Sequence, residues 1–347
     1  MSGGAKVRVG LVGCGYWGPK VIRAAASQPD VEVAALIDFR EDLRDALLRH
    51  YPLARSTATL GEALAQGPLD AVIVATNPAT HVEVASEAIA GGCHVMVEKP
   101  LALSAADCRE LGVQAREAGL VLMAGHTFRF SPLVNHVHSL IEGGEIGEIY
   151  SIDSQRLNLG RVRRDVDAIW NFAPHDISIL NFWLGGHPQA VHCHAYDYLQ
   201  PGIPDLAFLV LEYEHAVAHV HISWLHPSKV RRMTVIGSQK MVVYDDVEGQ
   251  IVVHDAGIDR EHVDRSFPDF ETFGEFRLIQ RVGDMHIPRV PVAEPLALQC
   301  RHFIDCITSG TEPITDFEDA ARVVEVLEAA SASHANGGAR VAINDLA

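Results

Sequence analysis

Short apolar runs alternate with segments of helical periodicity between residue 7 and about residue 126. The runs predict five strands, at residues 7–12, 31–37, 71–75, 94–97 and 120–124. The segments between them place apolar residues three and four positions apart, which is the spacing of a helix with one buried face. Strands and helices that alternate in this way indicate a parallel, doubly wound sheet with right-handed crossovers.

The pattern changes after about His126. A predicted helix at 132–142 is followed by runs with the length and alternation of strands, at residues 148–158, 188–198, 206–213, 216–224, 230–236 and 241–244. One helix, 175–184, interrupts these runs, and they indicate a large, mostly antiparallel open sheet. A final helical pair, 295–309 and 316–335, is expected to pack back on the first part of the chain.

We therefore expect an α/β protein with two domains. Residues 1–126 would form the parallel sheet and its helices, and residues 127–347 would form an α+β domain. The chain has 347 residues, which is long enough for two domains with full cores.

Three glycines follow the first predicted strand directly, as Gly13-x-Gly15-x-x-Gly18. This spacing allows a tight turn, a close approach of the backbone to a pyrophosphate, and close packing of strand against helix. The phosphates would lie at the positive end of the helix dipole. The next strand ends in Asp38, 20 residues after Gly18, where a carboxylate can accept hydrogen bonds from both ribose hydroxyls. Together these features predict a Rossmann domain that holds NAD or NADP.

NAD is the favoured cofactor, because the carboxylate of Asp38 would repel a 2′-phosphate. Arg40 keeps NADP open as the alternative, since its side chain could reach a phosphate or stack on adenine. Phe39 could equally cover the adenine ring.

The net charge of −17 argues against nucleic acid and membrane surfaces as partners. The start of the chain lacks an apolar signal core, and no run approaches the ~18 apolar residues of a membrane span. Six scattered cysteines without a CxxC pair indicate free thiols. We expect a cytoplasmic protein.

Glu98-Lys99-Pro100 follows the predicted strand 94–97 and would face the nicotinamide. A lysine there can donate a hydrogen bond to a substrate hydroxyl or carbonyl oxygen, and partial desolvation would favour its use in proton transfer. The residues alone leave an ordinary surface salt bridge open as the alternative for Lys99.

Several motifs occur in a fixed order along the chain: the glycine turn, Thr76-Asn77-Pro78-x-x-His81, Glu98-Lys99-Pro100, Gly125-His126-x-x-Arg129-Phe130-x-Pro132 and Gly-Glu-Ile-Gly-Glu-Ile-Tyr at 144–150. Together they resemble the Gfo/Idh/MocA family of glucose–fructose oxidoreductases, inositol dehydrogenases and related enzymes. The resemblance covers essentially the whole chain, and it is far more specific for the family than for a substrate.

The resemblance implies two catalytic residues. Lys99 matches the lysine that polarises the reacting oxygen, and His175 matches the acid/base histidine that opens a helix in the second domain. Many relatives carry an aspartate four residues before that histidine. This chain has Asn171 there, so a carboxylate–histidine pair is not implied. The motifs also imply a set of cofactor contacts: Gly13, Gly15, Tyr16, Trp17, Gly18, Asp38, Thr76, Asn77, His81 and Glu98.

Four arginines gather within nine residues, at positions 156, 161, 163 and 164. Guanidinium groups bind phosphate or carboxylate in a bidentate manner, although a solvated loop or an intersubunit salt bridge is the plainer interpretation. The segment around them resembles the nucleotide-sugar branch of the family, such as the UDP-N-acetylglucosaminuronate 3-dehydrogenases. The substrate contacts expected on this basis are Arg129, Arg156, Asn158, Arg163 and Asn171.

The sequence thus predicts NAD-dependent oxidation of a ring hydroxyl, at C3, of a phosphorylated or nucleotide-linked hexose. Three alternatives stay open: an NADPH-dependent ketoreductase of a nucleotide-linked deoxysugar, an inositol or polyol dehydrogenase, and a non-catalytic NAD-bound regulator. Histidines share strand faces at 192, 194, 215, 219 and 221, but without an HExxH pattern or carboxylate cluster we expect no metal. Since open sheets are commonly covered and family members pair these faces, we expect a homodimer or homotetramer.

Overall fold

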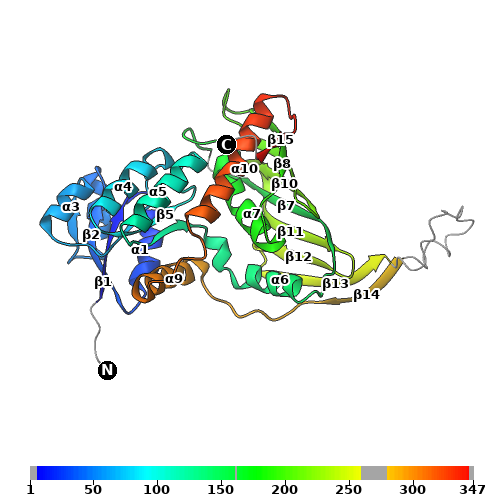
Figure 1. Cartoon of the computed structure of the whole chain (residues 1–347), viewed down its shortest axis with the longest axis horizontal. Helices are drawn as coiled ribbons and strands as arrows, with labels where there is room; N and C mark the ends of the chain where they lie inside the picture. Colours follow the sequence, from blue (N-terminus) through cyan, green and yellow to red (C-terminus); the bar gives the residue numbers. More distant parts are fainter. Residues whose placement is uncertain (1–5, 161, 259–279, 344–347) are drawn as a thin grey trace, which may run out of the picture. The chain divides into compact units, whose positions relative to one another are not determined.

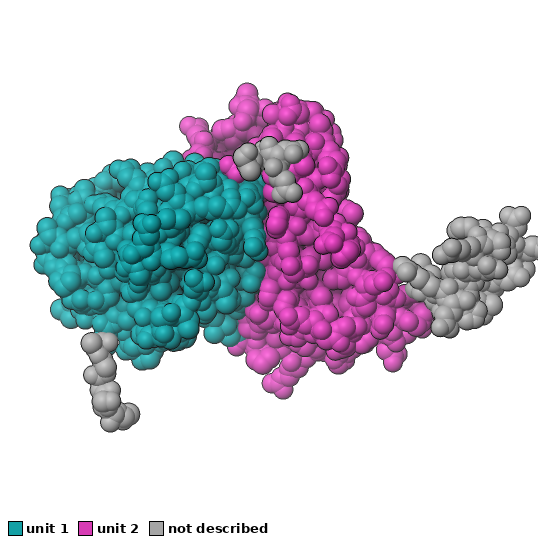
Figure 2. Space-filling model, viewed as in Figure 1, with its two compact units in different colours: residues 1–130, 293–325 teal, residues 131–292, 326–347 magenta. Residues whose placement is uncertain are grey.

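The computed structural model describes residues 6–160, 162–258 and 280–343. They form two compact units, which are best described separately (Figures 1 and 2). Unit 1 comprises residues 1–130 and 293–325, and unit 2 comprises residues 131–292 and 326–347. The first change of unit thus falls at 130/131 rather than at the expected 126/127, and a late segment returns to unit 1.

Unit 1 contains a sheet of six parallel strands in the order β3-β2-β1-β4-β5-β6. The strands are β1 (Val7–Val12), β2 (Val31–Ile37), β3 (Arg55–Thr57), β4 (Ala71–Val74), β5 (His94–Glu98) and β6 (Leu122–Gly125). The predicted doubly wound sheet is therefore confirmed. β3 was not predicted, because its three residues include no apolar one.

Helices connect these strands and cover both faces of the sheet (Figure 1). They are α1 (Gly18–Ala26), α2 (Glu41–Leu48), α3 (Leu60–Gln66), α4 (His81–Ala90) and α5 (Ala105–Glu117), with short 3₁₀ turns η1 (Pro78–Thr80) and η2 (Thr127–Phe130). Ser104 caps α5 by accepting a hydrogen bond from the Asp107 amide.

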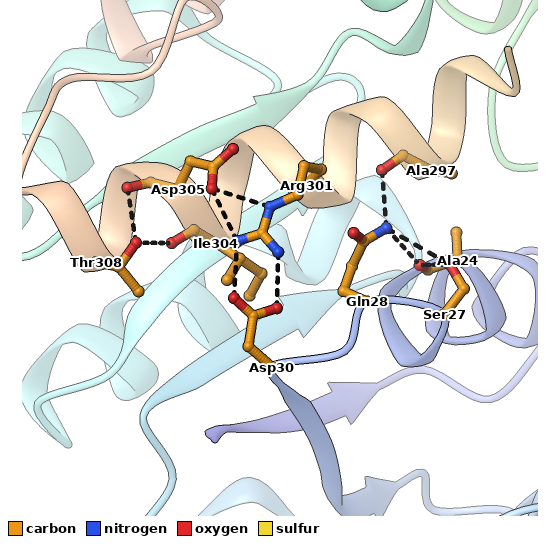
Figure 3. Close-up of polar contacts among 9 residues, drawn as sticks. All are labelled: Ala24, Ser27, Gln28, Asp30, Ala297, Arg301, Ile304, Asp305 and Thr308. Carbon is orange, nitrogen blue, oxygen red and sulfur yellow. Dashed lines mark hydrogen bonds and ion pairs between the residues drawn. The ribbon is translucent and has the colours of Figure 1, made fainter. Parts of the chain in front are cut away.

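Helix α9 (Pro295–Ser309) also belongs to unit 1, although it is far from the sheet strands in sequence. Phe303 and Ile304 lie in the apolar core that the helix shares with α1. At its surface, Arg301 donates to both carboxylate oxygens of Asp30, at 2.7 and 3.0 Å, and Gln28 donates to the carbonyl of Ala297 at 3.2 Å (Figure 3). The last helix, α10 (Phe317–Ala335), is divided between the two units after residue 325.

Unit 2 is built on a nine-stranded sheet in the order β14-β13-β12-β11-β7-β10-β9-β8-β15. The strands are β7 (Ile149–Leu159), β8 (Ala190–Tyr196), β9 (Leu206–Glu212), β10 (Val217–Ser223), β11 (Leu225–Gly237), β12 (Met241–Asp245), β13 (Gln250–Ile258), β14 (Gln280–His286) and β15 (Val341–Ala342). Among the described strands of this second sheet, only the β7–β10 pair is parallel, so the predicted, mostly antiparallel sheet is confirmed.

Two helices lie against one face of this sheet, α6 (Pro132–Glu142) and α7 (Ala168–Leu184) (Figure 1). Trp183 of α7 joins them, because its indole donates to the carbonyl of Val134 at 3.0 Å and its ring meets Tyr244 of β12 edge-on. Strand β9 alternates buried residues with more exposed ones, and Phe208 belongs to its outer row of side chains.

No helix in the described ranges combines the length and the apolar character that crossing a bilayer requires. All six cysteines are buried thiols that form no disulfide bond.

Candidate dinucleotide site and catalytic residues

The turn between β1 and α1 has the shape of a phosphate cradle. Gly13 has a φ of 97°, and a Cβ there would lie 2.7 Å from the carbonyl of Ala75. A Cβ at Gly18 would lie 2.0 Å from the carbonyl oxygen of Gly13, so the helix packs directly on the turn. At Gly15 a Cβ would meet nothing within 4 Å, and the backbone there is open to a ligand. The three glycines therefore fit a dinucleotide pyrophosphate.

The carboxylate of Asp38 is fixed beside this turn. Its Oδ2 accepts a hydrogen bond from the Cys14 amide at 2.8 Å, and its Oδ1 accepts one from the Arg40 amide at 2.9 Å. Cys14 is itself no nucleophile, since burial raises the pKa of its thiol to about 12. The position at the carboxyl end of β2 suits an adenosine ribose.

Tyr16 and Trp17 form the aromatic part of the turn. Tyr16 is 72% exposed, and the ammonium of Lys20 lies 3.7 Å from the centre of its ring. The same ammonium lies 4.9 Å from the centre of the Trp17 ring, and the Trp17 indole donates to the carboxylate of Glu98 at 2.6 Å. This bond links the start of α1 to the end of β5, where Lys99 follows.

Glu98 is buried, with 8% of its surface exposed. Burial raises the pKa of its carboxyl to about 7, although the Trp17 hydrogen bond and the charge of Lys99 act in the opposite direction. Gly125 on β6 leaves room for this carboxylate, because a Cβ there would lie 3.1 Å from it. The Lys99–Pro100 peptide that follows is cis.

The turn after β4 holds the other expected cofactor contacts. The Asn77 side chain accepts from the Ala79 amide at 3.0 Å, and the hydroxyls of Thr76 and Thr80 are 2.9 Å apart. His81 is fully buried, and its Nδ1 and Nε2 lie 2.8 and 3.3 Å from the carbonyl oxygens of Pro100 and Thr76. Burial lowers the pKa of this histidine. His81 thus ties this turn to the segment of Lys99.

His126 and Arg129 follow β6 and are also buried. Neither ring nitrogen of His126 has a hydrogen-bond partner, and burial together with the charges of Arg129 and Lys99 lowers its pKa to about 3. Arg129, an expected substrate contact, forms an ion pair with Asp319 of α10 at 3.3 Å. The sequence motif pointed to both residues but not to their burial.

In unit 2, the side chain of Arg156 is buried between strand β7 and helix α7. It is 5% exposed, and its guanidinium donates to both oxygens of Asp176 at 2.7 and 3.1 Å. Ser154 completes the group with a 3.0 Å bond to the same carboxylate. Bidentate pairs of this kind fix geometry, so Arg156 ties strand β7 to helix α7. The expectation that Arg156 contacts a substrate stays a prediction.

His175 lies inside α7 rather than at its start, which corrects the expected helix of 175–184. The helix begins at Ala168, where the Asp167 side chain caps it by accepting from the Trp170 amide at 2.8 Å. Asn171 and His175 are four residues apart and therefore share one face of the helix.

The remaining expected substrate contacts lie on β7 and in the loop after it. Asn158 is partly buried, and its side-chain oxygen has no hydrogen-bond partner. Arg163 pairs with Asp165, at 2.9 Å for its Nε, and its carbonyl accepts a bond from Gln200. Arg164 is exposed, and Arg161 lies outside the described residues. Within the described part of the chain, no three or more histidine, cysteine or carboxylate side chains form a group able to hold a metal.

Two family models match the chain. Residues 7–126 match the oxidoreductase family with an NAD-binding Rossmann fold, and residues 134–243 match the GFO/IDH/MocA C-terminal domain.

Among curated proteins, 4-carboxy-2-hydroxymuconate-6-semialdehyde dehydrogenase of a Sphingobium species is 32% identical over 53% of this chain and 61% of its own. The scyllo-inositol 2-dehydrogenase (NAD(+)) of Bacillus subtilis is 24% identical over 95% and 93% of the two chains. The matches span about half to three fifths of the length of the first curated relatives.

Two solved structures share the whole fold. GenD2 from gentamicin A biosynthesis, in complex with NAD, is 25% identical with a TM-score of 0.81 over 99% of this chain and 97% of its own. The WlbA dehydrogenase of Bordetella pertussis, in complex with NADH and UDP-GlcNAcA, is 24% identical with a TM-score of 0.77 over 97% and 98%.

Proposed function

The chain belongs to the Gfo/Idh/MocA family of NAD-binding oxidoreductases, and on that basis we propose that it oxidises a ring hydroxyl of a phosphorylated or nucleotide-linked hexose, at C3, to a keto sugar. The observation that carries the proposal lies in unit 1. Lys99 directly follows strand β5, which ends at Glu98. The hydrogen bond from Trp17 to Glu98 connects this strand end to the dinucleotide cradle.

The relatives support the substrate class. The WlbA structure contains UDP-GlcNAcA, and GenD2 comes from gentamicin A biosynthesis. In this chain, Arg163 and Asn158 are the proposed contacts for a phosphate or sugar, because Arg129 and Arg156 are committed to Asp319 and Asp176. Arg163 would have to exchange Asp165 for the ligand, which an exposed ion pair permits.

When bound, NAD supplies the hydride acceptor of the reaction. Lys99 donates a hydrogen bond to the reacting oxygen and stabilises the negative charge that develops on it. His175 accepts the proton of the hydroxyl group, and Asn171 orients the substrate from the same face of α7. The ring carbon loses a hydride with its electron pair and the oxygen loses a proton, so a carbonyl forms.

A free polyol is the second candidate substrate. The scyllo-inositol dehydrogenase of Bacillus subtilis aligns with nearly the whole chain, which favours this class. A polyol carries no phosphate, so the guanidinium of Arg163 would be dispensable for its turnover.

The test is absorbance at 340 nm with purified protein, NAD and a panel of UDP-glucose, UDP-N-acetylglucosamine, its uronic acid, glucose 6-phosphate and myo-inositol. A 2-oxo acid is added in parallel, because its reduction reveals a cofactor that is reoxidised in place. We expect turnover only with phosphorylated or nucleotide sugars, whereas turnover of inositol alone would contradict the proposal.

Two variants separate chemistry from cofactor binding. Lys99→Ala and His175→Ala should each lower kcat by about 100-fold or more, the usual contribution of such groups. Their affinity for NAD, measured by calorimetry, should stay within about two-fold of wild type. Equal kcat values in wild type and either variant would remove that residue from the mechanism.

A further inference from the structure

At the ribose end of the dinucleotide cradle, Arg40 and Asp42 form an ion pair beside Asp38. We propose that Asp42, on the first turn of α2, determines cofactor specificity by holding the guanidinium of Arg40 away from a 2′-phosphate. The inference rests on the NAD-binding part of the proposed function and does not depend on the sugar.

Asp38 is not the only charged residue at the carboxyl end of β2. Its two oxygens are already fixed by the amides of Cys14 and Arg40, so the carboxylate cannot turn away from an added phosphate. Two arginines nevertheless lie next to it in sequence or in space, Arg40 and Arg44. A guanidinium at such a site normally accommodates the 2′-phosphate of NADP.

Both arginines are committed to other partners. Arg40 donates to Asp42 through Nε, at 3.2 Å, and through a terminal nitrogen, at 2.7 Å. Arg44 donates to the carbonyl of Asp38 and, at 3.0 Å, to the hydroxyl of Ser56. Of the two, only the Arg40 contact is an ion pair that one substitution on a neighbouring side chain can release.

Asp42 has a second effect, on the end of the helix itself. The first turn of a helix presents unpaired amides that favour a phosphate. In α2 this turn carries the carboxylates of Glu41 and Asp42, which repel one. The Arg40–Asp42 pair is exposed on both sides, at 53% and 66%, so its removal leaves the core of unit 1 untouched.

The test uses nucleotide fragments and no turnover. In an Asp38→Ser background, Asp42→Asn should lower the Kd for adenosine 2′,5′-bisphosphate by about three- to five-fold, the range expected when a surface ion pair is released. The Kd for AMP, which lacks the 2′-phosphate, should change by less than about two-fold. Isothermal titration calorimetry measures both.

Asp45→Asn is the matched control. Asp45 is exposed on the same helix, so this variant removes the same charge without releasing Arg40. Adding Arg40→Gln to the Asp38→Ser, Asp42→Asn variant should remove most of the gain and leave only the part that comes from losing the Asp42 charge at the start of α2. An unchanged bisphosphate affinity in Asp42→Asn, or an equal gain in Asp45→Asn, would overturn the proposal.

AMP binding also shows whether the cradle is intact. If Asp42→Asn abolished it, Asp42→Ser would repeat the test with another short polar residue in the same helical turn. Absence of AMP binding in the wild type would contradict the dinucleotide site itself, which is a different failure from that of the specificity proposal.

Discussion

Glu98 shows how a single buried carboxylate connects the cofactor cradle to the reacting residue. One of its oxygens accepts the Trp17 indole hydrogen, and its backbone leads directly to Lys99. A buried carboxylate is costly unless it is hydrogen-bonded or protonated. The Trp17 indole supplies the hydrogen bond, and burial favours the protonated form by raising the pKa to about 7. The protonation of Glu98 should therefore affect the stability of unit 1.

This raised pKa predicts how stability depends on pH. The pKa of this carboxyl is about 7 in the folded protein and 4.5 in the unfolded one. Its contribution to stability is therefore fully present below pH 4.5 and is lost as the pH rises to about 7. Between pH 5 and pH 7, the unfolding free energy of the wild type should fall by about 2 kcal/mol relative to Glu98→Gln.

Urea titrations of the nucleotide-free protein at the two pH values measure this difference. His126 titrates in the opposite sense, because burial lowers its pKa, but it is present in both proteins and cancels. Parallel pH profiles for wild type and Glu98→Gln would show that Glu98 is ionised throughout.

At the residue scale, the glycine turn could be predicted from the sequence, whereas the partner of Arg156 could not. The glycines and Asp38 are a local motif, and they lie as their spacing requires. Arg156 instead found a partner on α7, twenty positions along the chain. This ion pair depends on how α7 packs against β7, so the spacing of residues in a motif could not predict it.

At the scale of elements, apolar runs predicted strands best where both faces are buried, as in β1 and β4. β3 was missed because its residues are polar. The start of α7 was missed because Pro174 marks a break in most sequences, whereas here it lies inside the helix that Asp167 caps.

Helix α9 provides a test of what holds a late segment in unit 1. Phe303 is 1% exposed in the shared core, whereas Arg301 forms a partly exposed ion pair with Asp30. Phe303→Ala should lower the unfolding free energy by about 3–5 kcal/mol, the usual cost of such a cavity. Arg301→Ala should cost about 1 kcal/mol or less.

Denaturant unfolding followed by tryptophan fluorescence compares the two variants. If Arg301→Ala cost as much as Phe303→Ala, the polar contacts of Figure 3 rather than the core would anchor the helix.

At the scale of the whole molecule, the candidate groups are distributed over two units. Unit 1 contains the dinucleotide cradle and Lys99, and unit 2 contains His175, Asn158 and Arg163. The proposed function assigns roles to residues of both units, and it rests on the family membership. The family could be inferred from the order of the motifs. The identity of the sugar could not, since only a few side chains determine it.

The outer face of the unit 2 sheet predicts self-association. Phe208 on β9 is 36% exposed and stacks on His221 of β10 at 4.4 Å, and Tyr196 and Val217 on neighbouring strands are exposed as well. We expect a homodimer or homotetramer in sedimentation velocity experiments. Phe208→Glu should dissociate it, because a charge would be buried in the contact. A monomeric wild type, or an unchanged oligomer in the variant, would contradict this expectation.

The central claim is that a sugar carbon gives its hydride to bound NAD. The most direct test is to supply the best substrate of the panel with deuterium at C3 and to analyse the reduced cofactor by mass spectrometry. The account predicts one deuterium in the NADH and a slower rate than with the unlabelled sugar. NADH without deuterium, formed at the same rate, would place the oxidation at another carbon and contradict the proposed reaction.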